Sequence, residues 1–209
     1  MKLFVIGIGL LAFVTGWARA QGPDNALTPE EAREGWALLF DGKSLAGWEA
    51  HATSLPTATG DWTVEDRAIV CPGTAPGWLG TSQTYANFTL KLEFRGPAAV
   101  NSGVFLRSQK EGQPHVTGYE VQIWDFQPDG FTTGSLVGSL KAGSTRIIPG
   151  RWNSYEIRAD GDHYVIVLNG KTLLDGHDSK HLSAGVIGFQ CQKDNRIEFR
   201  RIRLLPIKK

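Results

Sequence analysis

The sequence lacks a strong charge of either sign, because its 22 Lys and Arg residues nearly balance its 21 Asp and Glu residues. No basic run occurs along the chain, so nucleic acid is not expected as a partner. Internal repeats, low-complexity linkers and phosphate-binding glycine loops are also missing. No Ser-His-Asp or Cys-His arrangement is visible that would indicate a nucleophilic hydrolase. These absences favour one domain with neither a nucleic-acid nor a nucleotide partner.

Only one long apolar run occurs, at residues 3–17, between Lys2 and the small-residue segment 18–20. A charged start, a short apolar stretch and small residues are typical of a secretory signal peptide, so we predict one over residues 1–20. The run is too short to span a bilayer comfortably, which argues against a membrane anchor. The mature chain keeps 20 basic and 21 acidic residues. Its 189 residues are enough to form one domain with a full core. We expect it to be periplasmic or secreted, without membrane contact after cleavage.

Cysteine is scarce, with only Cys71 and Cys191, each near the end of a predicted strand. Export would permit a disulfide between them. The sequence does not give their distance, on which a disulfide depends. The preferred interpretation is two free, buried thiols, with a disulfide as the alternative.

Helix signals are confined to the N-terminal segment 21–35. Thr28-Pro29-Glu30-Glu31 is a capping box with proline at the first helical position, and Gly35 offers a stop, so one short helix is predicted over 29–34. The rest, residues 36–206, is predicted to be an all-β sandwich or barrel, because turn residues separate a dozen short apolar runs. The predicted strands are 36–40, 62–65, 68–71, 77–81, 88–95, 102–108, 118–124, 152–159, 164–168, 171–174, 186–190 and 197–205.

Two neighbouring strands between residues 101 and 125 carry polar and aromatic side chains on one face. By alternation these are Gly103, Phe105 and Arg107 on the first strand, and Glu120, Gln122 and Trp124 on the second. A cation, a carboxylate, an amide and aromatic rings together suit a hydroxyl-rich ligand. The strand 88–95 also alternates apolar and charged residues, so we expect all three strands in one broad sheet with a concave polar side.

Several ordered segments resemble the 3-keto-disaccharide hydrolase domain family. They are 39–48 (Leu-Phe-Asp-Gly-Lys-Ser-Leu-Ala-Gly-Trp), 87–95, 101–107 (Asn-Ser-Gly-Val-Phe-Leu-Arg), 118–125 (Gly-Tyr-Glu-Val-Gln-Ile-Trp-Asp), 150–157, 185–190 and 199–203. The resemblance covers residues 36–206. It implies a concanavalin A-like, two-sheet jelly roll whose concave face receives a sugar, and action on glycosides whose C3 hydroxyl has been oxidised to a ketone. This chain departs from the family where Val137 replaces a common Tyr and Arg201 a common Asn.

A 3-ketone acidifies the C2 proton, so the C1–O bond can break by elimination before water adds back. For this chemistry we assign Glu120 as the base, Arg107 as the cation at the developing enolate, and Asp125 as the acid. Glu120, Asp125 and Gln122 could also supply oxygen ligands to a hard divalent cation such as calcium, although no dense carboxylate cluster indicates one. The residues expected to contact a small carbohydrate substrate are Gln122, Trp124, Gln190, His115 and Asn101.

Purely structural interpretations of these residues also stay open. Arg107 and Glu120 could form an ion pair between strands, Asn101 could only shape a turn, and His115 could be a plain loop histidine. Trp124 is preferred over Trp78 for sugar stacking, since aromatic residues in sandwiches are more often core. His177 and His181 are expected in a solvated turn. Besides an enzyme, a non-catalytic carbohydrate-binding module is possible, as is an ordinary glycosidase using Glu120 and Asp125.

Overall fold

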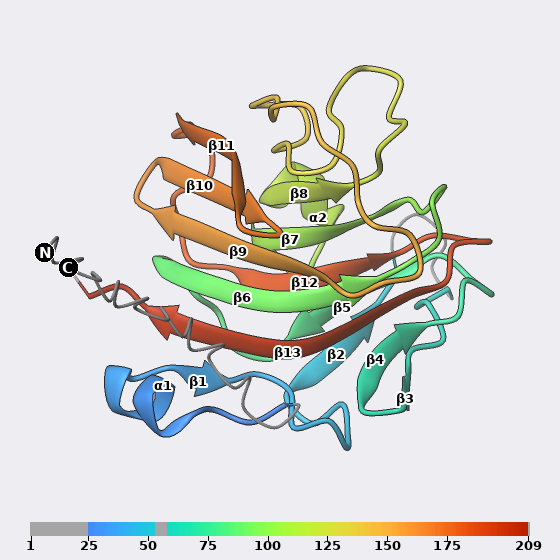
Figure 1. Cartoon of the computed structure of the whole chain (residues 1–209), viewed down its shortest axis with the longest axis horizontal. Helices are drawn as coiled ribbons and strands as arrows, with labels where there is room; N and C mark the ends of the chain where they lie inside the picture. Colours follow the sequence, from blue (N-terminus) through green and yellow to red (C-terminus); the bar gives the residue numbers. More distant parts are fainter. Residues whose placement is uncertain (1–24, 53–57, 209) are drawn as a thin grey trace, which may run out of the picture.

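The computed structural model describes residues 25–52 and 58–208, and they form a sandwich of two antiparallel sheets (Figure 1). The predicted signal peptide, residues 1–20, lies outside the described residues. No helix in the described ranges is long and apolar enough to cross a membrane. The predicted all-β architecture of residues 36–206 is confirmed.

The N-terminal helix α1 (Pro29–Glu34) has the predicted bounds. Thr28 Oγ1 accepts from the Glu31 N–H at 3.1 Å, and Glu31 Oε2 accepts from the Thr28 N–H at 2.9 Å. Gly35, with φ of 90°, ends the helix in a left-handed conformation that suits glycine. The expectation of a single helix is wrong, because a second one, α2 (Pro114–Thr117), forms between two strands.

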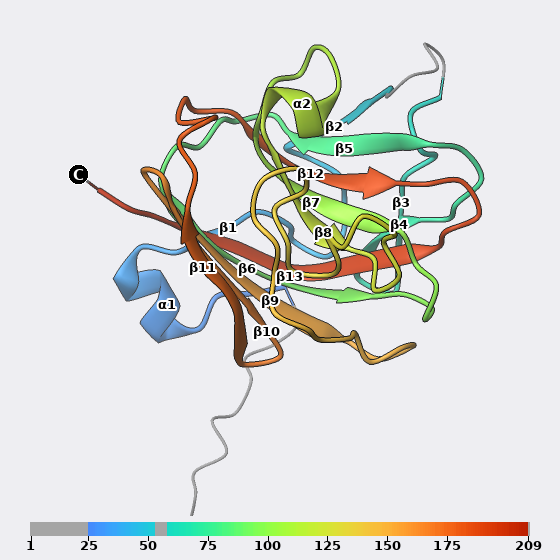
Figure 2. The ribbon, with the colours of Figure 1, turned by 90° about the horizontal axis from the view of Figure 1, so that it is seen from above.

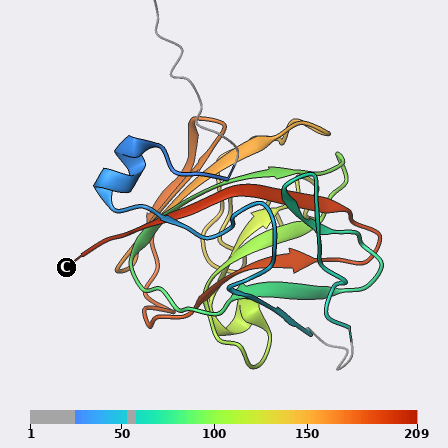
Figure 3. The ribbon, with the colours of Figure 1, turned by 90° about the horizontal axis from the view of Figure 1, so that it is seen from below.

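The larger sheet has eight strands. Its order is β11 (Lys171–His177), β10 (His163–Leu168), β9 (Asn153–Asp160), β6 (Phe88–Arg95), β13 (Ile197–Pro206), β4 (Ala68–Cys71) and β3 (Thr63–Glu65), with β1 (Ala37–Leu38) also on β13. Asn169 and Gly170, at φ of 49° and 80°, form the predicted tight turn between β10 and β11. In Figure 3 helix α1 lies on this sheet's side of the molecule.

The smaller sheet has five strands in the order β2 (Trp48–His51), β5 (Gly77–Thr81), β12 (Val186–Cys191), β7 (Ser102–Ser108) and β8 (Tyr119–Ile123). Strand β2 was not predicted. Figure 2 shows the two sheets one above the other, with α2 outside the smaller one. The expectation that β6 shares a sheet with β7 and β8 is wrong, because β6 pairs with β9 and β13. Alternation gives a strand's two faces but not its neighbours.

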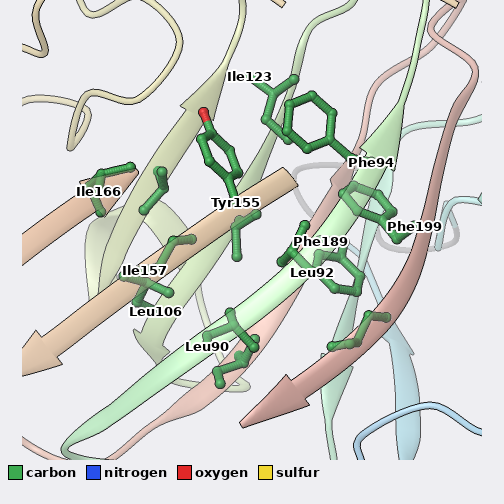
Figure 4. Close-up of a cluster of buried hydrophobic side chains, with 14 of the residues drawn as sticks. Leu90, Leu92, Phe94, Leu106, Ile123, Tyr155, Ile157, Ile166, Phe189 and Phe199 are labelled. Atoms are coloured by element: carbon green, nitrogen blue, oxygen red, sulfur yellow. The ribbon is translucent and has the colours of Figure 1, made fainter. Parts of the chain in front are cut away.

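The core fills the space between the sheets (Figure 4). Phe189 of β12 stacks on Phe199 of β13 with ring centroids 4.0 Å apart, which joins the two sheets at their centre. Tyr155 of β9 is buried and donates its hydroxyl to the Gln122 carbonyl of β8 at 2.8 Å. The inward residues of β6 are all apolar and buried, as their alternation predicts.

A disulfide joins Cys71 at the end of β4 to Cys191 at the end of β12, with Cα atoms 5.7 Å apart. The preferred interpretation of two free thiols is therefore wrong. The two cysteines meet because their strands belong to opposite sheets that stack at this point, which a sequence separation of 120 conceals. Closing so long a loop stabilises the fold by about 5 kcal/mol in the chain-entropy estimate.

Candidate functional site

The candidate site lies on the side of the five-stranded sheet that points away from the core. Trp48, Leu79, Val104, Val121 and Phe189 of these strands belong to the main core cluster. Their neighbours in the alternation point the other way, and three of them form a separate buried cluster. We call this surface the five-strand face; its side chains are those of Glu49, His51, Trp78, Phe105, Glu120, Gln122, Val186 and Gln190.

Strand register arranges these residues in two rows. One row crosses the sheet through His51, Trp78 and Gln190, which pair in that order on β2, β5 and β12. The other row runs from Glu49 past two glycines to Phe105 and Glu120 on β7 and β8. Residues from five separate segments of the chain therefore meet on one surface.

Three glycines make the floor of this face. A Cβ at Gly80 would lie 2.7 Å from Trp78 Cζ3, and one at Gly188 would lie 2.9 Å from Trp78 Cε3, so the indole lies flat over both. A Cβ at Gly103 would overlap the carboxyl of Glu120. The missing side chains thus allow Trp78 and Glu120 to lean toward the middle of the sheet.

Glu120 is the main titratable group of the face. The residue is only 5% exposed, and no hydrogen bond to its carboxyl is found among the contacts of residues 25–52 and 58–208. Burial raises the pKa of Glu120 to about 8. At pH 7 the carboxyl is therefore mainly protonated, which favours a proton donor over the base that the sequence analysis assigned.

Other buried polar atoms on the same face also lack partners. Among the described residues, His51 Nε2, Trp78 Nε1 and Gln190 Oε1 are all buried without a hydrogen bond. Buried polar groups are nearly always satisfied, and those that are not call for a ligand or water. A donor and an acceptor in one row are suited to hydroxyl groups of a ligand.

The face has walls on two sides. At one end, Lys110 reaches across from the segment after β7 to bind Glu49 Oε2 at 2.7 Å, and α2 packs on β7 and β8 beside it. Along β8, residues 134–137 add a further irregular strand, with Val137 N–H donating to the Glu120 carbonyl at 3.0 Å. Leu136 of this segment is in the core, so Val137 lies on the Glu120 side.

The predicted placement of Arg107 beside Glu120 is wrong. Strand β7 has an extra residue against β12 at this point, and Arg107 adopts φ of 54°, which turns its side chain off the five-strand face. The buried guanidinium instead donates to the carbonyls of Ala86, Gly161 and His181 at 2.6–3.1 Å, to Tyr164 Oη at 2.6 Å and to Asn87 Oδ1 at 3.3 Å. No ion pair with Glu120 occurs among the described contacts. Arg107 therefore holds loops together.

Asp125 is also engaged away from Glu120. Its Oδ1 accepts from Thr133 Oγ1 at 2.5 Å and its Oδ2 from the Ile147 N–H at 3.0 Å, so both oxygens stabilise the loop after β8. The predicted oxygen ligands Glu120, Asp125 and Gln122 are therefore not brought together. In the described ranges no group of three His, Cys, Asp or Glu residues is placed to hold a metal ion.

The other predicted contact residues are spread around the face. Gln122 and Gln190 lie on it, although Gln122 Oε1 accepts from the Ile123 N–H at 3.1 Å. Trp124 follows the last residue of β8 and is half-buried. His115 is exposed on α2, and Asn101 directly precedes β7, where its N–H donates to Asn195 Oδ1 at 2.8 Å.

Two residues of the face were missed by the sequence analysis. Trp78 was ranked below Trp124 for sugar stacking, because only the stacking of the sheets decides which side of β5 faces outward. His51 lies on the unpredicted strand β2, and its ring stacks on Trp78 with centroids 4.3 Å apart. Gly80 and Gly188, over which the Trp78 indole lies, could have indicated this site from the sequence. A glycine within a strand often marks a place where another group approaches the backbone closely.

The histidines with metal-like spacing lie elsewhere. His177 ends β11 and is exposed, with Nδ1 3.2 Å from Asp162 Oδ1. The ring of His181 packs edge-on against the ring of Tyr119. His177 is exposed as predicted but ends a strand instead of lying in a turn, while His181 is half-buried.

Comparisons with known proteins identify the family of the chain and its fold. Residues 35–205 match the 3-keto-alpha-glucoside-1,2-lyase-like domain family. A 3-keto-disaccharide hydrolase from Bacteroides thetaiotaomicron is 28% identical over 100 residues, which cover 44% of this chain and 33% of that protein. The match thus spans about a third of the length of this relative.

Solved structures share the fold. A candidate glycosyl hydrolase from Parabacteroides distasonis superposes with a TM-score of 0.75 and 25% identity, covering 89% of this chain and all of that one. A Bacillus subtilis protein with a galectin-like fold superposes with a TM-score of 0.54 and 12% identity, covering 77% of this chain and 89% of that one. The second likeness concerns the fold alone and confirms the lectin-like sandwich.

Proposed function

Because this chain belongs to the 3-keto-alpha-glucoside-1,2-lyase-like domain family, we propose that it cleaves 3-keto-glycosides on its five-strand face. The carrying observation is the buried carboxyl of Glu120, whose pKa burial alone raises to about 8, on the same face as the unpaired Trp78 Nε1 and Gln190 Oε1. A buried carboxyl without a charged partner destabilises a fold. Its presence beside polar atoms that lack hydrogen bonds therefore supports a catalytic role. The relative from Bacteroides thetaiotaomicron is named for the same substrate class.

The reaction is an elimination followed by hydration. Loss of the C2 proton forms the C1–C2 double bond while the C1–O bond breaks, and the departing oxygen takes a proton. Glu120, with a pKa of about 8, holds that proton at neutral pH and delivers it to the leaving oxygen. Water then adds across the double bond, its proton returning to Glu120, and the product is the free 3-keto sugar.

The C3 ketone of the substrate allows the few groups on the five-strand face to cleave the glycosidic bond. It acidifies the C2 hydrogen, so the enzyme needs no nucleophile and no second carboxyl opposite Glu120. The indole N–H of Trp78 can hydrogen-bond the oxygen that gains charge as the proton leaves. The unoxidised parent glycoside has no acidified hydrogen and is expected to remain intact.

We also propose that the mature protein works in the periplasm or outside the cell. The Cys71–Cys191 disulfide supports this location, since disulfides persist in oxidising compartments. Together with the signal-like residues 1–20, it favours export before folding.

The test is incubation of the purified protein with a 3-keto-disaccharide and with its unoxidised parent, with mass spectrometry of the products. We expect cleavage of the keto form only. Glu120→Gln should reduce the rate ~10²–10⁴-fold for a sugar leaving group and much less for a 4-nitrophenol leaving group, which needs no acid. Binding of both sugars without cleavage would instead identify a carbohydrate-binding module.

A further inference from the structure

Proton abstraction at C2 needs a base, and Glu120 is mainly protonated at neutral pH. A second proton-accepting group should therefore lie on the five-strand face, across the sugar from Glu120. The described side chains of this face include three ionisable groups, Glu49, His51 and Glu120. Glu49 is already bound to Lys110 at 2.7 Å, which leaves His51 as the candidate.

We propose, resting on the proposed function, that His51 is the catalytic base that removes the C2 proton of the 3-keto sugar. Its Nε2 is buried and has no hydrogen-bond partner among the described residues. The nearest carboxylate oxygen, Glu49 Oε2, is 4.0 Å away, beyond hydrogen-bond reach. The nitrogen is therefore free to accept a proton from a bound ligand.

The position of the imidazole is fixed by packing. His51 stacks on Trp78 at 4.3 Å with an angle of 21° between the rings. Trp78 in turn lies over two glycines and meets Phe105 edge-on at 5.9 Å, so it cannot move toward the sheet. The stack therefore lifts the His51 ring above the sheet floor and inward from the edge strand β2.

The separation from Glu120 suits two groups that act on one sugar. His51 leans over Trp78 of β5, while Glu120 leans over Gly103 of β7. Strands β5 and β7 are two spacings apart, about 10 Å. Gln190 on β12 lies between them with its free acceptor oxygen, where a sugar hydroxyl would bind.

The electrostatic environment gives the two groups opposite protonation states. Burial lowers the pKa of His51, so its imidazole is neutral and can accept a proton at pH 7, despite the opposing effect of Glu49. Burial raises the pKa of Glu120, so that group carries the proton to be donated. Such divergence is a recurring sign of an acid and base pair.

Every proton and electron pair in the two steps has a donor and an acceptor. His51 Nε2 takes the C2 proton, the C2–H electron pair becomes the C1–C2 double bond, and the C1–O pair leaves with the alcohol oxygen, which takes the Glu120 proton. On hydration, Glu120 takes a proton from water as the water oxygen bonds to C1. The His51 imidazolium then returns its proton to C2, and both residues recover their starting states.

Hydrogen exchange at C2 isolates this step from cleavage. The probe is 3-keto-1,5-anhydroglucitol, a 3-keto sugar without a leaving group at C1, incubated in D2O and followed by NMR. The wild-type protein should exchange the C2 hydrogen, and Glu120→Gln should still do so. His51→Gln and His51→Phe should each lose at least ~10²-fold of the exchange rate. His51→Phe retains an aromatic ring to stack on Trp78, and His177→Gln, which changes an exposed histidine at the end of β11 in the other sheet, is the matched control.

The outcomes separate the two proposals. Folded His51 variants, checked by melting temperature, that exchange C2 at the wild-type rate overturn the role of His51 while leaving the proposed function intact. Loss of exchange in His51→Gln with retention in Glu120→Gln supports it. A wild-type protein that neither exchanges C2 nor cleaves a 3-keto-disaccharide overturns both proposals.

Discussion

The two outer faces of the sandwich look alike in sequence but differ in how their polar groups are satisfied. On the eight-stranded sheet, the outward charges of β6, β9 and β13 bind one another; they are Lys91, Glu93, Arg95, Glu156, Glu198 and Arg200. Arg200 Nε lies 2.8 Å from Glu93 Oε2 and Lys91 Nζ 3.3 Å from Glu156 Oε2. Trp152 lies against the guanidinium groups of Arg95 and Arg200 at 4.6 and 4.1 Å. We call this surface the eight-strand face.

The five-strand face has the opposite character. The polar atoms of His51, Trp78 and Gln190 are buried there without partners in the described part of the chain, and burial raises the pKa of Glu120 to about 8. A surface whose charges neutralise one another gains little from a ligand. A surface with buried unpaired groups costs stability until a ligand supplies the missing bonds. A binding site is therefore distinguished from a solvated face less by how many polar groups it carries than by whether those groups already have hydrogen-bond partners.

The largest effect is expected from Arg107, a buried charge that is fully partnered like those of the eight-strand face. Arg107→Met should lower the free energy of unfolding by roughly 3–5 kcal/mol, because it leaves several buried acceptors unpaired. Turnover per folded molecule should stay near wild type. Urea denaturation with parallel assays measures both. Loss of turnover with normal stability would place Arg107 back at the site.

Glu120→Gln should have the opposite effect on stability. Burial raises the pKa of Glu120 from its ordinary value of 4.5 to about 8, so the folded state holds the extra proton between these limits. Stability of the wild type therefore falls as pH rises from 4.5 through 8, while the Gln variant does not follow. By pH 9 the variant should be more stable by roughly 2–4 kcal/mol.

Melting temperatures of the two proteins from pH 4.5 to 9 check this difference. Burial is the only cause of the shifted pKa of Glu120, so the difference between the two curves should persist when the series is repeated at two ionic strengths. Parallel pH curves for wild type and variant would mean that Glu120 is not the shifted group.

A third effect concerns the glycine floor. Gly103→Ala should push the Glu120 carboxyl aside, since the new methyl group would overlap it. Turnover of a 3-keto-disaccharide should fall about 10- to 100-fold, as a displacement of about 1 Å can cost that much. Gly143→Ala is the control, because its Cβ would lie an ordinary 3.5 Å from the Leu173 carbonyl. Equal rates for both variants would show that the floor does not position Glu120.

The smallest effect is expected on the eight-strand face. Glu93→Gln weakens the contacts to Arg200 and Arg201 and should cost about 1 kcal/mol, with no change in turnover. Thermal unfolding and steady-state kinetics of this variant, set beside Glu120→Gln, contrast the two faces directly. A substantial loss of turnover in Glu93→Gln would remove the distinction between them.

Local chemistry determined the elements themselves. The capping box at Thr28 and Glu31 sets the first helix, and the bounds of β4, β5, β6 and β7 follow from alternation and flanking turn residues. Glu120 and Gln122 were placed on a polar face for the same reason, since side chains alternate in any regular strand. The ordered family segments added the sugar chemistry to this local pattern.

Only the tertiary structure decided what lies beside what. The bulge at Arg107 reverses the side chain's direction, and alternation cannot foresee one extra residue. The pairing of β6 with β9 and β13, the Cys71–Cys191 disulfide and the stack of His51 on Trp78 all join segments far apart in the chain. Such contacts depend on how sheets register and stack, a property of the whole fold that no single segment encodes.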